Sequence, residues 1–344
     1  MKKYIPFLAV IIAFASCKKD PVPDKPAVVQ QSGFAQGQGM FITNEGNYGF
    51  SNAKVSYYNF NGTVTTDVFQ PTNGRPLGDV CQGMTIIGSK GYVLVNNSNK
   101  VEVVNMNDFH SVATITGFNS PRYFLPVSAT KAYVTDLYSN AITIVNLNTN
   151  TISGSIPCIG WTEQLVKSGN NVYVANHANG KVYVINSITD VISDSIAVAK
   201  GANSFQFDSS NKLWVLCGGE ATSSAPGGLY KINTITDAVE QSFSFAVSES
   251  PWRLKINNTG DTLYYLNNGV DKMWTGAGAL PSSAFIPQGS RNFYALGINP
   301  ANNQLYVSDA IDYTQAGKIY LYSNSGAEQS HFNAGTIPGD FIFY

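Results

Sequence analysis

The stretch KAYVTDLYSNAITIVNLNTNTISGSI, residues 131–156, decides the fold, because its pattern returns at residues 171–196 as NVYVANHANGKVYVINSITDVISDSI. Within each copy, apolar and polar residues alternate over runs of about six residues, and Ser, Asn and Thr fill the breaks between the runs. The first copy therefore predicts strands at 131–136, 141–146 and 151–156. The apolar run RYFLPV, residues 122–127, precedes that copy and predicts a fourth strand. A strand-built repeat of this length is typical of propellers and solenoids.

An aromatic residue in the second strand of each copy marks the repeat along the chain. These residues are Tyr92, Tyr133, Tyr173, Trp214, Tyr264 and Tyr306, at spacings of 41, 40, 41, 50 and 42 residues. Phe41 marks a seventh copy that lacks a first strand of its own, and the apolar run GDFIFY at 339–344 can supply it. Such closure protects strand edges that an open array exposes. The sequence therefore predicts an all-β fold, a seven-bladed β-propeller of four-stranded antiparallel blades, closed where the C-terminal strand joins the N-terminal blade.

The composition and charge are those of an ordinary all-β domain. Of the 344 residues only 12% are charged, with 21 basic residues against 22 acidic ones. Because there is no basic excess, we expect no nucleic-acid partner. Seven blades of this type need about 300 residues. We therefore assign residues 36–344 to a single propeller domain.

The first 35 residues do not fit the repeat and resemble an export signal followed by a tether. Lys2 and Lys3 precede the apolar run YIPFLAVIIAFAS, which is too short to span a bilayer core of about 30 Å. The run ends in small residues before Cys17, as in a bacterial lipoprotein signal, in which that cysteine becomes the lipidated first residue. We predict a signal peptide at 1–16, then lipidated Cys17 and a flexible tether at 17–35. The alternative is a plain export signal with an incidental cysteine.

Three cysteines remain, Cys81, Cys158 and Cys217. In an exported protein an odd number leaves at least one thiol unpaired within the chain. None of the three has metal-ligand spacing. We expect buried thiols that pack within the blades, and we assign them no function.

Alternating strand direction places two kinds of link on one face of a propeller, which we call the top face. These are the links from the second strand to the third and from each blade to the next. They are long and dissimilar, as at 45–53, 70–83, 218–228 and 310–317, whereas the links on the opposite, bottom face are short and uniform. Because binding surfaces are usually built from variable loops on a rigid scaffold, we expect the top face to be the functional one.

The chain has only four arginines, and all of them fall in top-face links that lead into an innermost strand, with aromatic residues beside them. Arginine offers a planar fork of N–H donors for carboxylate, phosphate or amide oxygens, and it stacks on flat rings. A rim of this kind suits a large, flat ligand that carries oxygen groups. The predicted ligand-binding residues are Arg75, Arg122, Tyr123, Trp161, Glu163, His177, Trp252, Arg253, Arg291 and Tyr294. Alternatively, the arginines bond to loop carbonyls and brace neighbouring blades.

No group of residues predicts catalysis or metal binding. His177 has no second metal ligand near it in sequence, and nothing pairs Glu163 or Glu249 with a nucleophile. Asn or Asp ends six of the seven second strands, at Asn44, Asn96, Asp136, Asn176, Asn267 and Asp309. Such side chains can bind Ca²⁺, but they more often cap the turn that follows. We therefore expect no enzyme activity, no metal and no required cofactor.

The repeats resemble the YVTN-type (YncE-like) β-propeller repeat over residues 39–344, on motifs such as PRYFLPVSATKAYVTD and AITIVNLNTNTISGSI. The run RPLGDVCQGMTIIGSKGYVLVNNSNKVEVVN at 75–105, followed by SPRYF, is similar to surface-layer-like propeller lipoproteins of Bacteroidetes, which lie in the outer membrane. One branch of that group, the BtuG type, captures cobalamin at the cell surface and passes it to a TonB-dependent transporter. GWTEQ at 160–164 departs from the commoner Pro-Glu pattern of YVTN repeats, which indicates a pocket particular to this protein's own branch.

The resemblance implies an outer-membrane lipoprotein, anchored through Cys17, that captures a corrinoid such as cobalamin and supplies a TonB-dependent transporter. A corrinoid is flat, ringed with amides and carries a phosphate, in agreement with the predicted rim. Two other interpretations stay open: a protein-interaction propeller without a small-molecule ligand, and a propeller lyase or lactonase. We expect the protein to face the cell surface. The periplasm stays the alternative, because the acidic residues that often follow the lipidated cysteine of surface-exposed lipoproteins are here only Asp20 and Asp24.

Overall fold

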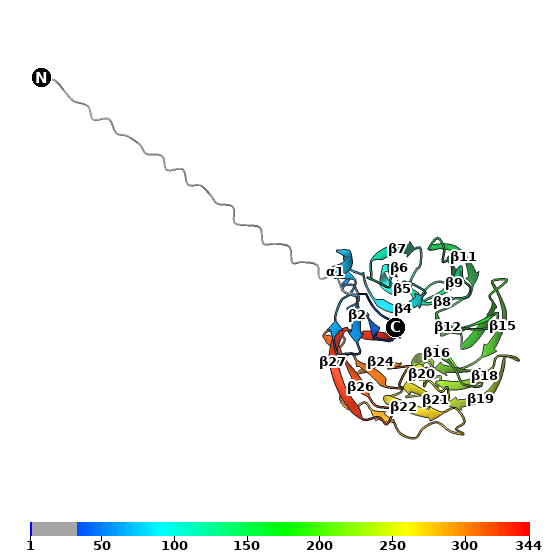
Figure 1. Ribbon diagram of the computed structural model, residues 1–344. Helices are drawn as coiled ribbons and strands as arrows, with labels where there is room; N and C mark the ends of the chain where they lie inside the picture. The colour runs from blue at the N-terminus through cyan, green and yellow to red at the C-terminus, as the bar shows by residue number, and fades with distance from the viewer. Residues whose placement is uncertain (2–32) are drawn as a thin grey trace. The chain divides into compact units, whose positions relative to one another are not determined.

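The computed structural model describes Met1 and residues 33–344. The predicted signal peptide, the lipidated Cys17 and most of the predicted tether lie outside the described residues. Residues 33–344 form one compact unit of blades around a ring (Figure 1). Phe34, which the sequence prediction assigns to the tether, is buried against Phe41, Tyr57 and Phe109. Within this unit no helix has the length and hydrophobicity needed to cross a membrane.

The described residues contain 28 strands in seven four-stranded antiparallel sheets, each sheet being one blade. The innermost strands are β28 (Pro338–Phe343), β4 (Cys81–Ile87), β8 (Pro121–Pro126), β12 (Thr162–Ser168), β16 (Ala202–Phe207), β20 (Trp252–Ile256) and β24 (Phe293–Ile298). The second strands are β1 (Gly39–Asn44), β5 (Lys90–Val95), β9 (Lys131–Asp136), β13 (Asn171–Asn176), β17 (Lys212–Cys217), β21 (Thr262–Leu266) and β25 (Leu305–Asp309).

The outer half of each blade consists of a third and a fourth strand. The third strands are β2 (Lys54–Asn59), β6 (Lys100–Asn105), β10 (Ala141–Asn146), β14 (Lys181–Asn186), β18 (Gly228–Asn233), β22 (Gly269–Trp274) and β26 (Ala316–Tyr322). The fourth strands are β3 (Val64–Thr65), β7 (Ser111–Thr116), β11 (Thr151–Pro157), β15 (Val191–Ala197), β19 (Ala238–Ser244), β23 (Ile286–Pro287) and β27 (Glu328–Thr336). Helix α1 (Gln70–Asn73) and the short 3₁₀ turns η1 (Asn96–Ser98) and η2 (Ala221–Ser223) lie in top-face links.

The ring closes through the last strand, as predicted. β28 pairs antiparallel with β1, so that Phe41 lies opposite Ile342 and Met40 opposite Phe343. Beyond the strand, the N–H of Gly37 donates to the carbonyl of Tyr344 at 2.7 Å. In Figure 1 the blue N-terminal strands consequently lie beside the red C-terminal ones. The prediction of a seven-bladed propeller closed by its C-terminal strand is therefore confirmed.

The blades bury their apolar faces against one another. All seven marker aromatics of the second strands are at most 4% exposed: Phe41, Tyr92, Tyr133, Tyr173, Trp214, Tyr264 and Tyr306. A typical cluster joins two successive blades, with Tyr92 and Val103 of one blade packed against Phe124 and Val134 of the next. Because each blade finds its apolar partners in its neighbours, the stability of one blade depends on the whole ring.

The polar residues at the ends of the second strands cap turns and links. Asp136 accepts the N–H of Tyr138 at 2.9 Å, and Asn176 accepts that of Asn179 at 2.9 Å. Asn44 instead donates to the hydroxyl of Ser56 on the neighbouring strand at 2.9 Å. Asn176 donates to the carbonyl of Ile159 at 2.9 Å. The predicted capping of the following turn is therefore confirmed at Asp136 and Asn176, but not at Asn44. The three remaining thiols, Cys81, Cys158 and Cys217, are free and buried, as predicted.

Candidate functional site

Every innermost strand has a β-bulge near its top-face end. On β8, Pro121 pairs with Asp136 and Phe124 with Val134, so two residues of β8 oppose one residue of β9. Equivalent register shifts occur on the other six innermost strands. A bulge bends its strand and redirects side chains, and bulges are common beside functional sites. The bulges place one residue of each blade at an equivalent position, the bulge ring, made of Gln82, Arg122, Glu163, Asn203, Arg253, Tyr294 and Gly339.

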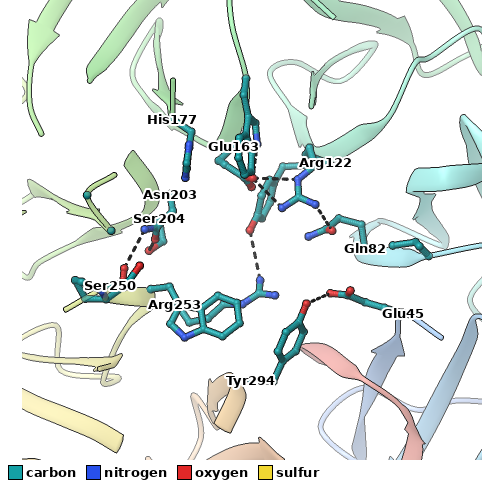
Figure 2. A pocket seen from close by; sticks show the side chains of 17 residues that line it. Glu45, Gln82, Arg122, Glu163, His177, Asn203, Ser204, Ser250, Arg253 and Tyr294 are labelled. Carbon is teal, nitrogen blue, oxygen red and sulfur yellow. Dashed lines mark hydrogen bonds and ion pairs between the residues drawn. The ribbon is translucent and has the colours of Figure 1, made fainter. Parts of the chain in front are cut away.

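The six side chains of the bulge ring line a cavity of about 390 Å³, which opens on the top face (Figure 2). The seventh position, Gly339, has no side chain, and Glu45 from the link after β1 occupies its sector. A Cβ atom on Gly339 would lie 3.0 Å from Oε1 of Glu45, so the glycine provides room for this carboxylate. The volume falls within the usual range of small-molecule pockets, about 300–1,000 Å³.

Aromatic rings form two walls of the cavity. On one wall, the indole of Trp161 stacks on the imidazole of His177, with ring centroids 3.8 Å apart and planes at 22°. On another, Trp252 and Tyr294 meet edge to face at 5.0 Å. The guanidinium of Arg253 lies 5.1 Å from the ring centre of Trp252 and 6.0 Å from that of Tyr294. Flat rings at fixed angles favour ligands that are themselves flat.

Arg122 and Glu163 form an ion pair inside the cavity wall. Oε1 of Glu163 accepts from Nη2 of Arg122 at 2.7 Å, from Nε at 3.1 Å, and from the indole Nε1 of Trp161 at 2.6 Å. Nη1 of Arg122 donates to Oε1 of Gln82. The Glu163 side chain is 5% exposed and that of Arg122 is 18% exposed. Arg122 therefore connects the blades of Gln82 and Glu163 as well as lining the cavity.

Arg253 differs from the other three arginines, because no ion pair joins it to a carboxylate among residues 33–344. Its Nη1 donates to the hydroxyl of Tyr123 at 3.5 Å, and its buried Nε has no partner. The backbone at Arg253 is left-handed, with φ of +62°, and Val80, which also lines the cavity, has φ of +59°. Left-handed conformations cost side-chain-bearing residues energy and are frequent at functional sites. The cavity thus contains an unsatisfied cation on a strained backbone.

The titratable groups of the cavity are tuned by burial. Burial lowers the pKa of His177, although Glu163 acts in the opposite direction, so the imidazole is neutral at pH 7 and serves as a flat surface. Burial raises the pKa of Tyr123 to about 12, which keeps its hydroxyl protonated. Burial also raises the pKa of Glu45, an effect that Arg253 partly offsets. Among the described residues, no group of three or more His, Cys, Asp or Glu side chains is placed to bind a metal.

Eight of the ten predicted ligand-binding residues line this cavity: Arg122, Tyr123, Trp161, Glu163, His177, Trp252, Arg253 and Tyr294. Arg75 and Arg291 lie outside it and contact the outer strands of their blades. Arg75 pairs with Glu102 of β6 at 2.6 Å, and Arg291 with Glu328 of β27 at 2.7 Å. The guanidinium of Arg291 also lies 3.8 Å from the ring centre of Tyr320. These two arginines brace their own blades, so the expectation that all four surround one funnel is not met.

Sequence reasoning missed several lining residues, chiefly Glu45, Gln82, Asn203, Ser204 and Ser250. Gln82 and Asn203 occupy the same repeat position as Arg122 and Arg253, and comparing that position across all seven copies would have revealed them. Glu249, which the sequence brings near the funnel, instead accepts a hydrogen bond from Asn267 at 2.9 Å and does not line the cavity.

Glu45→Gln is expected to stabilise the protein at neutral pH. Because the folded-state pKa of Glu45 is raised, the carboxylate destabilises the fold above that pKa, and this cost disappears as the pH falls below about 4. We expect a gain in the free energy of unfolding at pH 7 and none at low pH. Urea unfolding of both proteins at the two pH values measures it. Glu240→Gln, at an exposed ion pair with Lys212, is the control, and equal gains in both variants would contradict the prediction.

The chain matches the family described as "Domain of unknown function (DUF5074)" over residues 38–339. No functionally curated protein is significantly similar to it in sequence. Among solved structures, a quinonprotein alcohol dehydrogenase-like protein from Bacteroides thetaiotaomicron is 14% identical, with a TM-score of 0.69 over 89% of this chain and 78% of that one. Hydrazine synthase of Kuenenia stuttgartiensis is 13% identical, with a TM-score of 0.65 over 76% and 88%. Virginiamycin B lyase from Staphylococcus aureus is 13% identical, with a TM-score of 0.58 over 73% and 83%.

Identities this low establish the fold alone, and the fold fits the YncE-like propellers broadly. The family match covers nearly the whole propeller, from the first residue before β1 to the bulge of β28. The chain therefore belongs to the DUF5074 family.

Proposed function

We propose that this protein captures a flat ligand bearing amide or phosphate groups in the top-face cavity, with a corrinoid such as cobalamin as the best candidate. The observation that carries this proposal is Arg253, a guanidinium without a carboxylate partner that faces aromatic rings in a 390 Å³ cavity. A buried donor left unpaired costs free energy, so a ligand that supplies an oxygen acceptor gains what the protein leaves unsatisfied.

The size of the cavity supports a ligand that is only partly enclosed. In this proposal one arm or one edge of a corrinoid enters the 390 Å³ cavity, and its ring lies across the mouth. Tyr313 extends the aromatic surface outward, because its ring packs against Tyr294 at 5.8 Å and is 45% exposed. Tyr48 and Tyr138, in other top-face links, are 76% and 74% exposed. Exposed tyrosines supply flat contact area at low entropic cost.

The proposed capture is binding rather than catalysis. Among the described residues, the imidazole of His177 makes no hydrogen bond, and Ser204 donates to Asn203 at 2.6 Å rather than to a base. His177 and Ser204 therefore do not form a nucleophile–base pair with each other.

We further propose that the protein is anchored through a lipidated Cys17 in the outer membrane, faces the cell surface, and supplies a TonB-dependent transporter. Phe34 lies on the bottom face, opposite the top-face links that line the cavity. It packs against Phe109, which lies in the bottom-face link between β6 and β7.

A second candidate function is that of an interaction propeller without a small-molecule ligand. Apolar side chains on the top face favour it, since Phe50 is 75% exposed and Ile159 is 71% exposed. Exposed apolar groups gathered on one face are common at protein–protein contacts. This candidate predicts no affinity of the isolated protein for a corrinoid.

Calorimetric titration with cobalamin, cobinamide and haem tests the proposal. We expect a dissociation constant below about 1 μM for a corrinoid, equivalent to about −8 kcal/mol. Arg253→Ala should weaken binding about 10–100-fold, the range for one hydrogen bond to a charged group. Arg291→Ala, which removes an arginine outside the cavity, should leave the affinity unchanged. Absence of binding to every compound would reject corrinoid capture and favour the interaction propeller.

A further inference from the structure

The cavity presents an unused hydrogen-bond donor on Arg253. A guanidinium has five N–H groups. Among the described residues, the one hydrogen bond of Arg253 runs from Nη1 to Tyr123 at 3.5 Å, close to the limit of an effective bond. Nη2 donates no hydrogen bond to any residue between 33 and 344. Trp252 and Tyr294 hold the guanidinium from the side, so its position does not depend on a polar partner. The donor is fixed in place before any ligand arrives.

Glu45 presents an unused acceptor in the same part of the cavity. Its Oε1 accepts from the hydroxyl of Tyr294 at 2.9 Å, while Oε2 has no hydrogen-bond partner among the described residues. The absent side chain of Gly339 leaves the space that this carboxylate occupies. Figure 2 shows the Glu45 carboxylate and the Arg253 guanidinium pointing into the same space beside Tyr294.

The two groups attract each other but do not pair. Arg253 is the first of the charged neighbours that lower the pKa of Glu45, yet no ion pair joins their side chains. Tyr294 accounts for this separation, because it binds Glu45 through its hydroxyl and supports Arg253 through its ring. A rigid donor and a rigid acceptor therefore stand apart, and a ligand group fits between them. Such preorganisation lowers the entropic cost of binding.

We propose that this pair recognises a carboxamide, or the equivalent C(=O)–N–H edge of a ring, in which the carbonyl oxygen accepts from Nη2 of Arg253 and the N–H donates to Oε2 of Glu45. The inference rests on the proposed function, since it names the chemical group that the same cavity takes. Glu45 repels a ligand carboxylate in this place, and Arg253 repels a ligand ammonium group. Sites built around paired donors and acceptors discriminate strongly, because the wrong ligand leaves buried groups unpaired.

Two small pyridine derivatives of the same shape test the inference without a corrinoid. Nicotinamide and nicotinate differ only in carboxamide against carboxylate, and both are small enough for the cavity. Their dissociation constants are measured by ligand-observed saturation-transfer NMR at pH 7 with the full protein at up to about 10 mM ligand. We expect nicotinamide to bind at least about tenfold more tightly than nicotinate, a difference of about 1.4 kcal/mol.

Glu45→Gln provides the decisive comparison, because it keeps the shape of the side chain and removes its charge. The glutamine amide can donate to a carboxylate, so nicotinate should bind at least about tenfold more tightly than to the wild type. Nicotinamide should bind more weakly than to the wild type, because Nε2 of the glutamine donates where Oε2 of Glu45 accepts. Glu240→Gln, an exposed position on β19, is the matched control and should preserve the wild-type preference. Thermal melting of each variant confirms that it is folded.

The outcomes separate this inference from the proposed function. A preference for nicotinamide that Glu45→Gln removes supports the carboxamide site even if no corrinoid binds. Equal binding of the two fragments to the wild type, binding of neither, or a preference that Glu45→Gln leaves unchanged would overturn it, even if cobalamin binds tightly.

Discussion

Arg122→Ala should lower the free energy of unfolding by about 2–3 kcal/mol, because it leaves the carboxylate of Glu163 buried without its cation. Glu163 is 5% exposed and receives two hydrogen bonds from Arg122. Removing one partner of a buried pair costs more than the pair itself contributes, since the remaining charge loses its compensation. We place the expected loss of stability at the low end of the range for breaking a buried ion pair, because the Arg122 side chain is 18% exposed. Guanidinium unfolding measures the change.

Arg253→Ala is the matched control for this effect. It removes the same side chain from the equivalent bulge, but it breaks no ion pair among the described residues, so the stability should change by less than about 1 kcal/mol. Glu163→Gln in the Arg122→Ala background should recover part of the lost stability, because it removes the uncompensated charge. Equal destabilisation by the two arginine variants would show that Arg122 acts through packing rather than through its ion pair.

The fold was predictable because one periodic signal determines it. Aromatic residues such as Tyr133 and Tyr173 occur at a nearly constant spacing. They lie in the second strands, and their side chains are fully buried. The boundaries followed from turn chemistry, since β9 ends at Asp136, where the side chain caps the turn. These signals are local in sequence, and each blade repeats them.

The site was less predictable because it depends on backbone register. Arg122 and Arg253 are the second residues of their innermost strands and fall in bulges, which turn them into the cavity. Arg75 lies several residues before β4 and turns outward to Glu102. Arg291 lies two residues before β24 and turns outward to Glu328. Sequence placed all four in similar links, but a bulge is a property of strand pairing that no single residue type announces.

The position of Glu45 in the cavity could not be predicted from the sequence, for a different reason. Its carboxylate occupies the sector left by Gly339, which is almost 300 residues away in the chain and reaches it only through ring closure. The acceptor of the cavity therefore exists only once the last strand has docked. A pattern read blade by blade cannot show such a contact.

Deleting residues 338–344 is expected to abolish cooperative folding. The deletion removes β28, which pairs with β1 from Met40 to Asn44 and covers Ile42 with Phe341. Met40, Phe41 and Ile42 are fully buried in the intact ring and would lose their partners. A domain of this kind is stable by only about 5–15 kcal/mol in total, so losing a central strand exceeds what the remaining six blades can compensate. Circular-dichroism melting and size-exclusion chromatography should show aggregation or a broad transition without a midpoint.

Deleting Tyr344 alone is the control that separates closure from a general effect of shortening the chain. It removes two backbone hydrogen bonds, with Gly37 and Gly39, and a ring contact with Phe41, but leaves β28 paired. The expected cost is about 1–3 kcal/mol, with a cooperative transition at a lower temperature. If the longer deletion also melts cooperatively near the wild-type midpoint, the open ring is stable without β28. In that case Glu45 would face an empty sector in a folded protein, and loss of the preference for nicotinamide in that variant would assign the cavity's selectivity to closure itself.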